Sequence, residues 1–466
     1  MVGLLYVQTR CHAQTPTNSN DSDDALHHFL SPATKNHRKY VCLSGCHLCH
    51  GALNYLDFFV SLLACIATKF EGSVMANQLA FAIITPHTIR KSRTGSVLAR
   101  LLSRTSAELV TTQMLAPSKA FAETYAASIP VSANPTEEFH RQLIRDYIKI
   151  NLSPDADGRR HRALMLVFKG ENAFENIREV VGKLPLSGTS GETIRDTYGD
   201  LVCNTDGSVQ YFEPAILTST SQDTVASELK LWVDFAEQQP TILENICVYD
   251  APAVVEKSLV IIKPDNWRYH TLRPGAIIDI FSRTGLRIIG SKVCRISVAQ
   301  ALEFYGQVEE VLCNKLAPSI GRKAREILNQ ELDIELPAEA EAALAKTVGI
   351  PYAKTQFENI IEFMTGLRPS QCPEKEYAHC GKVKCLVLIY EGQNAIRKIR
   401  DVLGPTDPSK APSGTVRREF GSNITVNSAH ASDSPASAQR EMGILCMEKG
   451  NFVPIIKQAL EENTDA

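Results

Sequence analysis

The sequence lacks several features that would place the protein in a specialised class. No apolar run reaches the ~18–20 residues that a membrane-spanning helix needs. The longest, Phe58 to Ala67, follows Asp57 and starts too late for an ordinary signal peptide. The 13 cysteines show no disulfide-framework spacing. These absences favour a reduced cytoplasmic protein without a membrane partner.

Two further absences narrow the function. The formal net charge is only −3 over 466 residues, so the charge balance does not indicate a general binder of nucleic acids. No G-x-x-x-x-G-K-[ST] motif occurs, which excludes a P-loop enzyme. What remains is an ordinary globular composition, with 44% hydrophobic and 22% charged residues, and a length that suggests two or three domains.

Residues 1–74 differ in amino-acid composition from the rest of the chain and hold five of the 13 cysteines. Cys46, Cys49 and His50 form a C-x-x-C-H pattern, which can attach haem or, with Cys42, contribute to a zinc site. A strand-like run begins only after Met75. A mis-called start or a disordered N-terminal extension is therefore the favoured interpretation, with metal and haem binding as alternatives.

The rest of the chain contains an internal repeat. Each copy begins with an apolar β-like run, a proline turn, a glycine and an amphipathic helix, and later segments also match in order. The matching segments are 79–104 with 259–283, 163–182 with 385–404, and 192–199 with 414–421.

The repeats define the expected domains. They span about 77–235 and 256–462, and the stretch 236–255 between them is predicted to be a linker. The second copy is longer between its first helix and its later strands. The extra residues, about 306–355, are rich in Ala, Glu and Leu, so we expect a helical insertion.

Six motifs of the second repeat resemble those of the nucleoside diphosphate kinase family. In order they are I-K-P-D (262–265), E-F-Y (303–305), Y-E-G-x-N (390–394), L-G-P-T-D-P (403–408), G-T-V-R (414–417) and N-x-x-H-x-S-D-S (427–434). The family fold is a ferredoxin-like α/β (α+β) sandwich, βαββαβ with an antiparallel sheet. The resemblance therefore implies two tandem copies of this fold.

The resemblance also implies a phosphate-accepting nucleophile. His430 matches the family histidine that holds the phosphate between two half-reactions of a ping-pong transfer. A neutral imidazole suits this task near pH 7, because its ordinary pKa is about 6.5. Glu441 matches the carboxylate that orients this histidine, and Ser432 matches a serine that supports the same group.

The remaining site residues are assigned by the same resemblance. They surround an anionic substrate, so cations and hydroxyl groups are expected among them. The implied roles are phosphate and sugar binding for Lys263, phosphate binding for Arg400 and Arg417, phosphate hydroxyl contacts for Tyr305 and Thr406, ribose binding for Asn427, and base packing for Phe357, Ile360 and Ile424. Mg²⁺ should arrive with the nucleotide, and no protein metal site is expected.

The first repeat is a degenerate copy in this interpretation. Thr85 stands at the lysine position and Leu217 aligns with the histidine, although Arg178 and Arg195 remain. Without the nucleophile no phosphohistidine can form. We expect a structural role as a dimer-like partner in cis, or a regulatory role, with weak nucleotide binding as an open alternative.

The favoured function is a nucleoside diphosphate kinase that transfers the γ-phosphate of ATP to nucleoside diphosphates through phospho-His430. One alternative is a catalytically silent nucleotide-binding regulator or scaffold, because the insertion after Tyr305 falls where the family has its lid. Another is phosphotransfer to a protein histidine. The family commonly forms hexamers or tetramers, and a tandem chain predicts a homo-oligomer of fewer than six chains.

Overall fold

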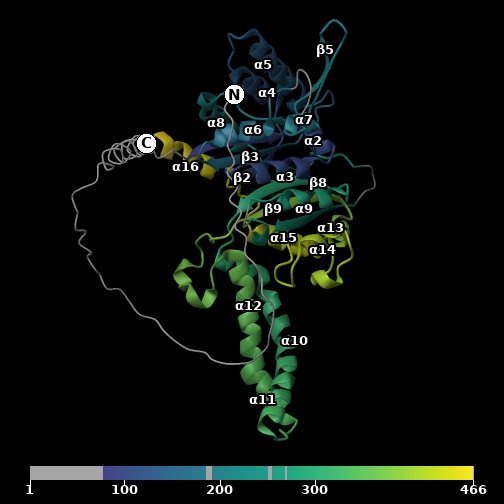
Figure 1. Cartoon of the computed structure of the whole chain (residues 1–466), viewed down its shortest axis with the longest axis vertical. Coiled ribbons are helices and arrows are strands. Elements are labelled where there is room, and N and C mark those ends of the chain that lie inside the picture. Colours follow the sequence, from purple (N-terminus) through teal and green to yellow (C-terminus); the bar gives the residue numbers. More distant parts are fainter. Residues whose placement is uncertain (1–76, 185–190, 250–253, 268–269, 465–466) are drawn as a thin grey trace, which may run out of the picture. The chain divides into compact units, whose positions relative to one another are not determined.

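A computed structural model describes residues 77–184, 191–249, 254–267 and 270–464 (Figure 1). The predictions for residues 1–74, including the C-x-x-C-H pattern, lie outside these residues. None of the described helices combines the length and the apolar character that a membrane crossing requires.

The first repeat forms a four-stranded antiparallel sheet with its most apolar strand inside. The order is β2-β3-β1-β6. The strands are β1 (Gln78–Ile84), β2 (Glu108–Leu115), β3 (Ala163–Gly170) and β6 (Ile216–Leu217). Alternate residues of β1 lie in two different hydrophobic clusters, because helices cover both faces of the sheet. The helices on one face are α3 (Thr94–Arg104) and α6 (Ala173–Val181), and those on the other are α4 (Lys119–Ser128), α5 (Pro135–Tyr147) and α8 (Val225–Ala236).

The second repeat forms a sheet with the equivalent order, β8-β9-β7-β10, and it is also antiparallel. Its strands are β7 (Val255–Ile262), β8 (Arg287–Cys294), β9 (Cys385–Gln393) and β10 (Ala429–Ala431). Helix α9 (Arg273–Ser282) lies between β7 and β8 in the chain, and α13 (Ala395–Leu403) between β9 and β10. Both repeats are therefore consistent with ferredoxin-like units.

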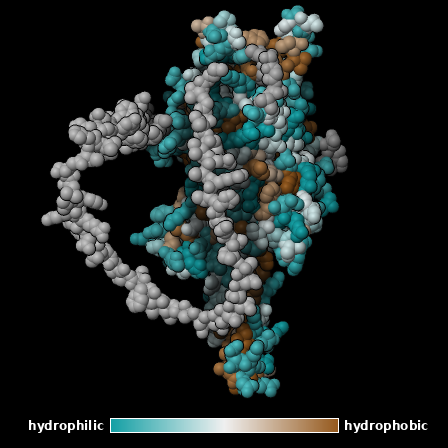
Figure 2. Space-filling model, viewed as in Figure 1, coloured by the Kyte–Doolittle hydropathy of each residue, from teal (hydrophilic) through white to brown (hydrophobic). Residues whose placement is uncertain are grey.

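The expected insertion is helical and projects as a hairpin at the lower end of Figure 1. It consists of α10 (Val298–Leu332), α11 (Glu339–Leu344), the π-helical η4 (Ala345–Gly349) and α12 (Ile350–Thr365). Helix α10 begins with a capping box in which Ser297 and Gln300 satisfy each other's backbone N–H groups. Figure 2 shows hydrophobic residues among hydrophilic ones on this hairpin, where Ile327 and Leu332 are exposed.

The repeats pack on each other through equivalent helices, α3 and α9. A Cβ on Gly95 would collide with the backbone of Gly275 and Asp279. A Cβ on Gly275 would collide with the backbone of Gly95 and Ala99. Ala99 and Asp279 occupy the same place in the repeat, so the contact is reciprocal, as in an isologous dimer interface.

The segment at the C-terminal end of each repeat packs against the other repeat. Leu243, within the predicted linker, is buried and its N–H donates to Ile289 O on β8 over 2.9 Å. Helix α16 (Phe452–Thr464) follows the second sheet in the chain but buries Phe452 and Ile456 in the core of the first repeat. These apolar side chains join the two repeats into one compact unit.

The remaining elements are short or connect the two sheets to their helices. They are α2 (Pro86–Arg90), η1 (Ile148–Leu152), α7 (Ile194–Tyr198), β4 (Asp200–Cys203), β5 (Val209–Glu213), η2 (Gln222–Thr224), η3 (Pro264–Asn266), η5 (Pro369–Gln371), η6 (Glu374–Glu376), η7 (Pro408–Lys410), α14 (Val416–Phe420) and α15 (Pro435–Ile444).

Candidate active site

His430 lies on the short edge strand β10, opposite Ile261 of β7. The strand is preceded by Ser428 in the left-handed region at φ 69°, a conformation that needs support from its surroundings. That support comes from Lys263 N–H (2.9 Å) and Asn266 Nδ2 (2.7 Å), which both donate to Ser428 O. The His430 side chain stays 21% exposed. The backbone thus presents the imidazole at the rim of the sheet.

Glu441 of α15 orients the imidazole through a hydrogen bond to its Nε2 atom. His430 Nε2 lies 3.0 Å from Glu441 Oε2, and Ser432 Oγ donates to the same oxygen over 2.6 Å. A carboxylate that accepts from both groups places the imidazole proton on Nε2. Nδ1 then carries the lone pair, and it has no hydrogen-bond partner among the described residues. The three residues predicted to form the catalytic group therefore meet.

Lys263 lies at the end of β7, close to the histidine strand. Its Nζ donates to Asn427 Oδ1 over 2.7 Å, and both side chains are buried. Asn427 is itself fixed, since its Nδ2 donates to Thr406 O (3.1 Å) and Ile424 O (2.7 Å). Burial and then the nearby Arg417 charge lower the pKa of Lys263 to about 7. An anion bound here would favour the charged form of the lysine.

Arg417 of α14 spans the loop after α13 and the histidine strand. Its Nη1 donates to Gly404 O (2.9 Å) and its Nη2 to Ala429 O (3.2 Å). Its Nε is buried without a partner among the described residues. Burial and the Arg400 charge lower the pKa of Arg417 to about 10, and Arg400 itself is exposed on α13. Two guanidinium groups held this close suit a phosphate, which can accept from both.

Two aromatic rings from the start of α10 flank the imidazole. The Phe304 and Tyr305 centroids lie 5.0 Å and 6.3 Å from that of His430, both with edge-on geometry. Tyr305 Oη is buried without a partner among the described residues, and burial raises its pKa. A free hydroxyl donor in this place fits the phosphate contact that the sequence predicts.

Two of the three residues predicted to pack on the base lie on α12, and the third lies on an exposed loop. Phe357 of α12 is only 4% exposed and belongs to the hydrophobic core, whereas Ile424 is 63% exposed on a loop. Ile360 is partly buried against the same core as Phe357. Thr406 is exposed, and its carbonyl rather than its hydroxyl makes the observed contact, with Asn427. The three residues predicted to pack on the base therefore do not share one environment.

Four neighbours of this site escaped the sequence-based prediction. Phe304 packs on His430, Asn266 supports Ser428, and the Phe363 ring lies 5.8 Å from Lys263 Nζ. Arg273 of α9 donates to Ser428 Oγ over 3.4 Å. Phe304 lies inside the E-F-Y motif, so its position was a usable signal. The others carry no local pattern that distinguishes them.

The first repeat keeps the architecture of this site without its histidine. Leu217 of β6 pairs with Ile83 of β1, in the register in which His430 pairs with Ile261. The preceding left-handed residue is also present, as Ala215 at φ 61°. The strand register therefore places Leu217 at the position that the sequence alignment assigned to it.

The supporting pair behind the histidine is also retained. Ser219 Oγ donates to Glu228 Oε1 over 2.9 Å, as Ser432 does to Glu441. At the lysine position, Thr85 Oγ1 donates instead to the buried Glu213 Oε1 over 2.9 Å. A carboxyl thus occupies the side of the site where the second repeat has an amine.

Comparison with known proteins adds the family. The family model described as nucleoside diphosphate kinase matches residues 351–450. The nucleoside diphosphate kinase of Staphylothermus marinus is 31% identical over 190 residues, which cover 41% of this chain and 92% of that protein. The Pyrobaculum aerophilum enzyme is 30% identical, covering 40% of this chain and 93% of that protein. The Halorhodospira halophila enzyme is 28% identical, with coverage of 40% and 90%.

A solved NDP kinase structure from Pyrobaculum aerophilum is 28% identical and covers 41% of this chain and 95% of that one, with a TM-score of 0.28, too low for a comparison of folds. The sequence relatives establish the family, because at least 92% of the length of each of these two proteins is aligned with this chain. Through a domain in its C-terminal half, the chain belongs to the nucleoside diphosphate kinase family.

Proposed function

We propose that this protein is a nucleoside diphosphate kinase that works through His430. The observation that carries the proposal is the imidazole itself. Its Nε2 is held by Glu441, and its Nδ1 has no hydrogen-bond partner among the described residues. The cationic residues Lys263 and Arg417 donate to the carbonyls of Ser428 and Ala429, which directly precede it. A nucleophile oriented in this way and surrounded by cations is what transfer of an anionic phosphoryl group needs.

The reaction proceeds in two balanced steps. His430 Nδ1 attacks the γ-phosphorus of ATP, an N–P bond forms, and the bond from phosphorus to the β–γ bridging oxygen breaks with its electron pair leaving on ADP. A terminal oxygen of the second nucleoside diphosphate then attacks phosphorus, and the N–P bond breaks. The Nε2 proton stays on the hydrogen bond to Glu441 throughout.

Three cations supply the electrostatic part of this proposal. Lys263, Arg400 and Arg417 would bind phosphate oxygens, and Tyr305 Oη would donate to one of them. Mg²⁺ enters as part of the substrate, bound to phosphate oxygens. Nothing in the described part of the chain gathers three His, Cys, Asp or Glu side chains in a metal-binding arrangement.

The first repeat acts in this proposal as a degenerate partner domain. Leu217 cannot form an N–P bond, and the reciprocal α3–α9 contact resembles a dimer interface closed within one chain. We therefore expect a particle of fewer than six chains. Light scattering after size-exclusion chromatography would measure it, and a hexamer would contradict it.

The test is a coupled assay of ATP with GDP, together with labelling from γ-labelled ATP. Wild type should turn over and acquire an acid-labile, alkali-stable phosphate, and His430→Ala should lose both by roughly 10⁴-fold or more. His379→Ala, at an exposed histidine outside the site, is the matched control and should behave as wild type. Wild type that binds nucleotide without labelling would instead identify a silent scaffold. Label that passes to a second protein and not to GDP would identify a protein phosphotransferase.

A further inference from the structure

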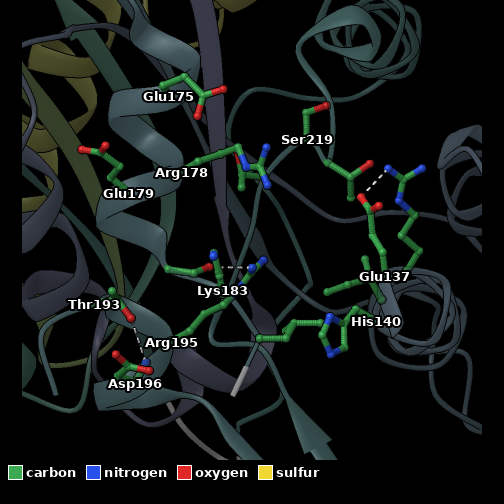
Figure 3. Close-up of a pocket in the computed structure, with 16 residues that line it drawn as sticks. Glu137, His140, Glu175, Arg178, Glu179, Lys183, Thr193, Arg195, Asp196 and Ser219 are labelled. Carbon is green, nitrogen blue, oxygen red and sulfur yellow. Dashed lines mark hydrogen bonds and ion pairs between the residues drawn. The ribbon is translucent and has the colours of Figure 1, made fainter. Parts of the chain in front are cut away.

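The first repeat contains an open cleft of about 900 Å³. Its walls come from α5, α6, the residues after α6, α7 and the residues that follow β6 (Figure 3). Apart from α5, these elements correspond to α13, α14 and the residues after β10, which surround His430 in the second repeat. The cleft is therefore the structural counterpart of the candidate active site.

Arg195 of α7 makes the same two hydrogen bonds to backbone carbonyls as Arg417 does in the second repeat. Its Nη1 donates to Gly182 O (2.9 Å) and its Nη2 to Ile216 O (3.4 Å), which are the counterparts of the two carbonyls that Arg417 contacts. The first repeat has lost its histidine and its lysine, yet this arginine keeps both contacts. Arg178, at the position of Arg400, is also present and lines the cleft.

Charged side chains of both signs line the same space, where Glu137, Glu175, Glu179 and Asp196 accompany the cations. Figure 3 shows Arg178, Lys183 and Arg195 on one side of the cleft, with His140 of α5 opposite. The sequence motifs gave no reason to connect His140 with this site, because α5 lies outside every matched segment. Burial and then the Arg195 charge lower the pKa of His140, so it is a neutral hydrogen-bonding group near pH 7.

Several of these groups are left without a partner. Among the described residues, His140 Nε2, Arg141 Nε, Arg195 Nε and Thr220 Oγ1 are buried polar atoms with no hydrogen bond, and all four residues line this cleft. Buried polar atoms in native proteins are rarely unsatisfied. All four belong to residues that can donate, and Arg141 and Arg195 can only donate, so the wall of this cleft is rich in hydrogen-bond donors.

We propose that this cleft binds a nucleoside di- or triphosphate and holds it without chemistry. The phosphates would accept from Arg178, Lys183 and Arg195, and the cleft is far larger than one phosphate requires. Ile144 and Leu184 supply an apolar wall for the nucleoside. Leu217 excludes transfer to the protein, because it stands where the nucleophile would be. The choice of a nucleotide as the ligand rests on the proposed function of the second repeat. The existence of the cleft is independent of that function.

The experiment is calorimetric titration of the full chain with ADP. A Lys263→Gln/Arg400→Gln background weakens the second site, so that the remaining binding reports on the cleft. In this background, adding Arg178→Gln/Lys183→Gln should weaken ADP binding roughly 10-fold to 100-fold, since two charge-assisted contacts are lost. Both residues are exposed, so the variant should fold. Lys119→Gln/Lys230→Gln removes the same charge from exposed positions outside the cleft and should leave the affinity unchanged.

Two results would overturn the proposal. One is ADP binding in the background that is absent or that the Arg178/Lys183 pair does not alter. The other is inorganic pyrophosphate binding as tightly as ADP, which would leave an anion site that does not recognise a nucleoside. Failure of the kinase assay alone would not produce either result, because the cleft is measured by binding and not by turnover.

Discussion

The two repeats carry the same supporting interactions around different central residues. Ser219 and Glu228 repeat the geometry of Ser432 and Glu441, but only the second repeat places a histidine in front of the carboxylate. A buried carboxyl needs donors whether or not it assists catalysis. The Ser–Glu hydrogen bond is thus present in a repeat that has no histidine at this place, so such a pair is by itself no evidence of activity.

The two sites also differ in the charged groups that are buried next to the edge strand. In the second repeat Lys263 and Asn427 form a buried polar pair beneath the histidine strand. In the first repeat Glu213 takes that side, and it accepts from Thr85 Oγ1 (2.9 Å) and Tyr147 Oη (2.7 Å). Burial raises the pKa of Glu213, which favours its neutral form. The first repeat thus has a buried carboxyl where the second has a buried cation.

The largest difference should appear when the two equivalent glutamates are changed. Glu441→Gln should lower turnover by on the order of 10²-fold, because the neutral amide no longer favours the Nε2–H tautomer of His430. Glu228→Gln, at the same place in the first repeat, should leave turnover unchanged. Steady-state rates across pH would measure both, since a merely structural role for Glu441 would change the rate without altering the pH profile. Equal losses in the two variants would break the comparison.

A smaller effect is expected at the reciprocal helix contact. Gly95→Ala and Gly275→Ala should each destabilise the fold by about 3 kcal/mol, because each new Cβ meets backbone atoms that cannot rotate away. Gly306→Ala in α10 is the control, since nothing lies within 4 Å of its added Cβ and alanine favours a helix. Denaturant midpoints would compare the three. A large loss in only one of the two interface variants would show that the contact is not reciprocal.

The smallest effect concerns the pH dependence of stability. Burial raises the pKa of Glu228 to about 7, above the ordinary 4.5 that it would have when unfolded. Between these values the folded state binds more protons, so its stability falls as the pH rises. Removing this group with Glu228→Gln should flatten the profile between pH 5 and pH 8 by about 1–2 kcal/mol.

Denaturation at both pH values would measure this change, with Glu171→Gln at an exposed position as the control that keeps the wild-type profile. A Glu228→Gln profile as steep as that of wild type would mean that Glu228 stays ionised in the folded protein at pH 5 and above.

Much of the candidate site could be predicted from sequence because its motifs are local. I-K-P-D and N-x-x-H-x-S-D-S each occupy a few consecutive residues, and the structure brings Lys263, Asn427, His430, Ser432 and Glu441 together. The assignments at the base end were less useful. Phe357 is separated from the motifs by the insertion, and its burial in the core depends on how α12 packs and not on its neighbours in the chain.

By itself the sequence determined the internal repeat, because apolar periodicity and short motifs are recorded locally along the chain. The order of strands and helices and the role of His430 were predicted through the resemblance to a family. Only the tertiary structure decided that Ser219 donates a hydrogen bond to Glu228, that His140 lines the cleft, and that α16 packs into the core of the first repeat. Each of these depends on side chains distant in sequence meeting across packed elements. Such contacts are settled by packing and by the need to satisfy buried polar groups, which leave no periodic or local trace in the chain.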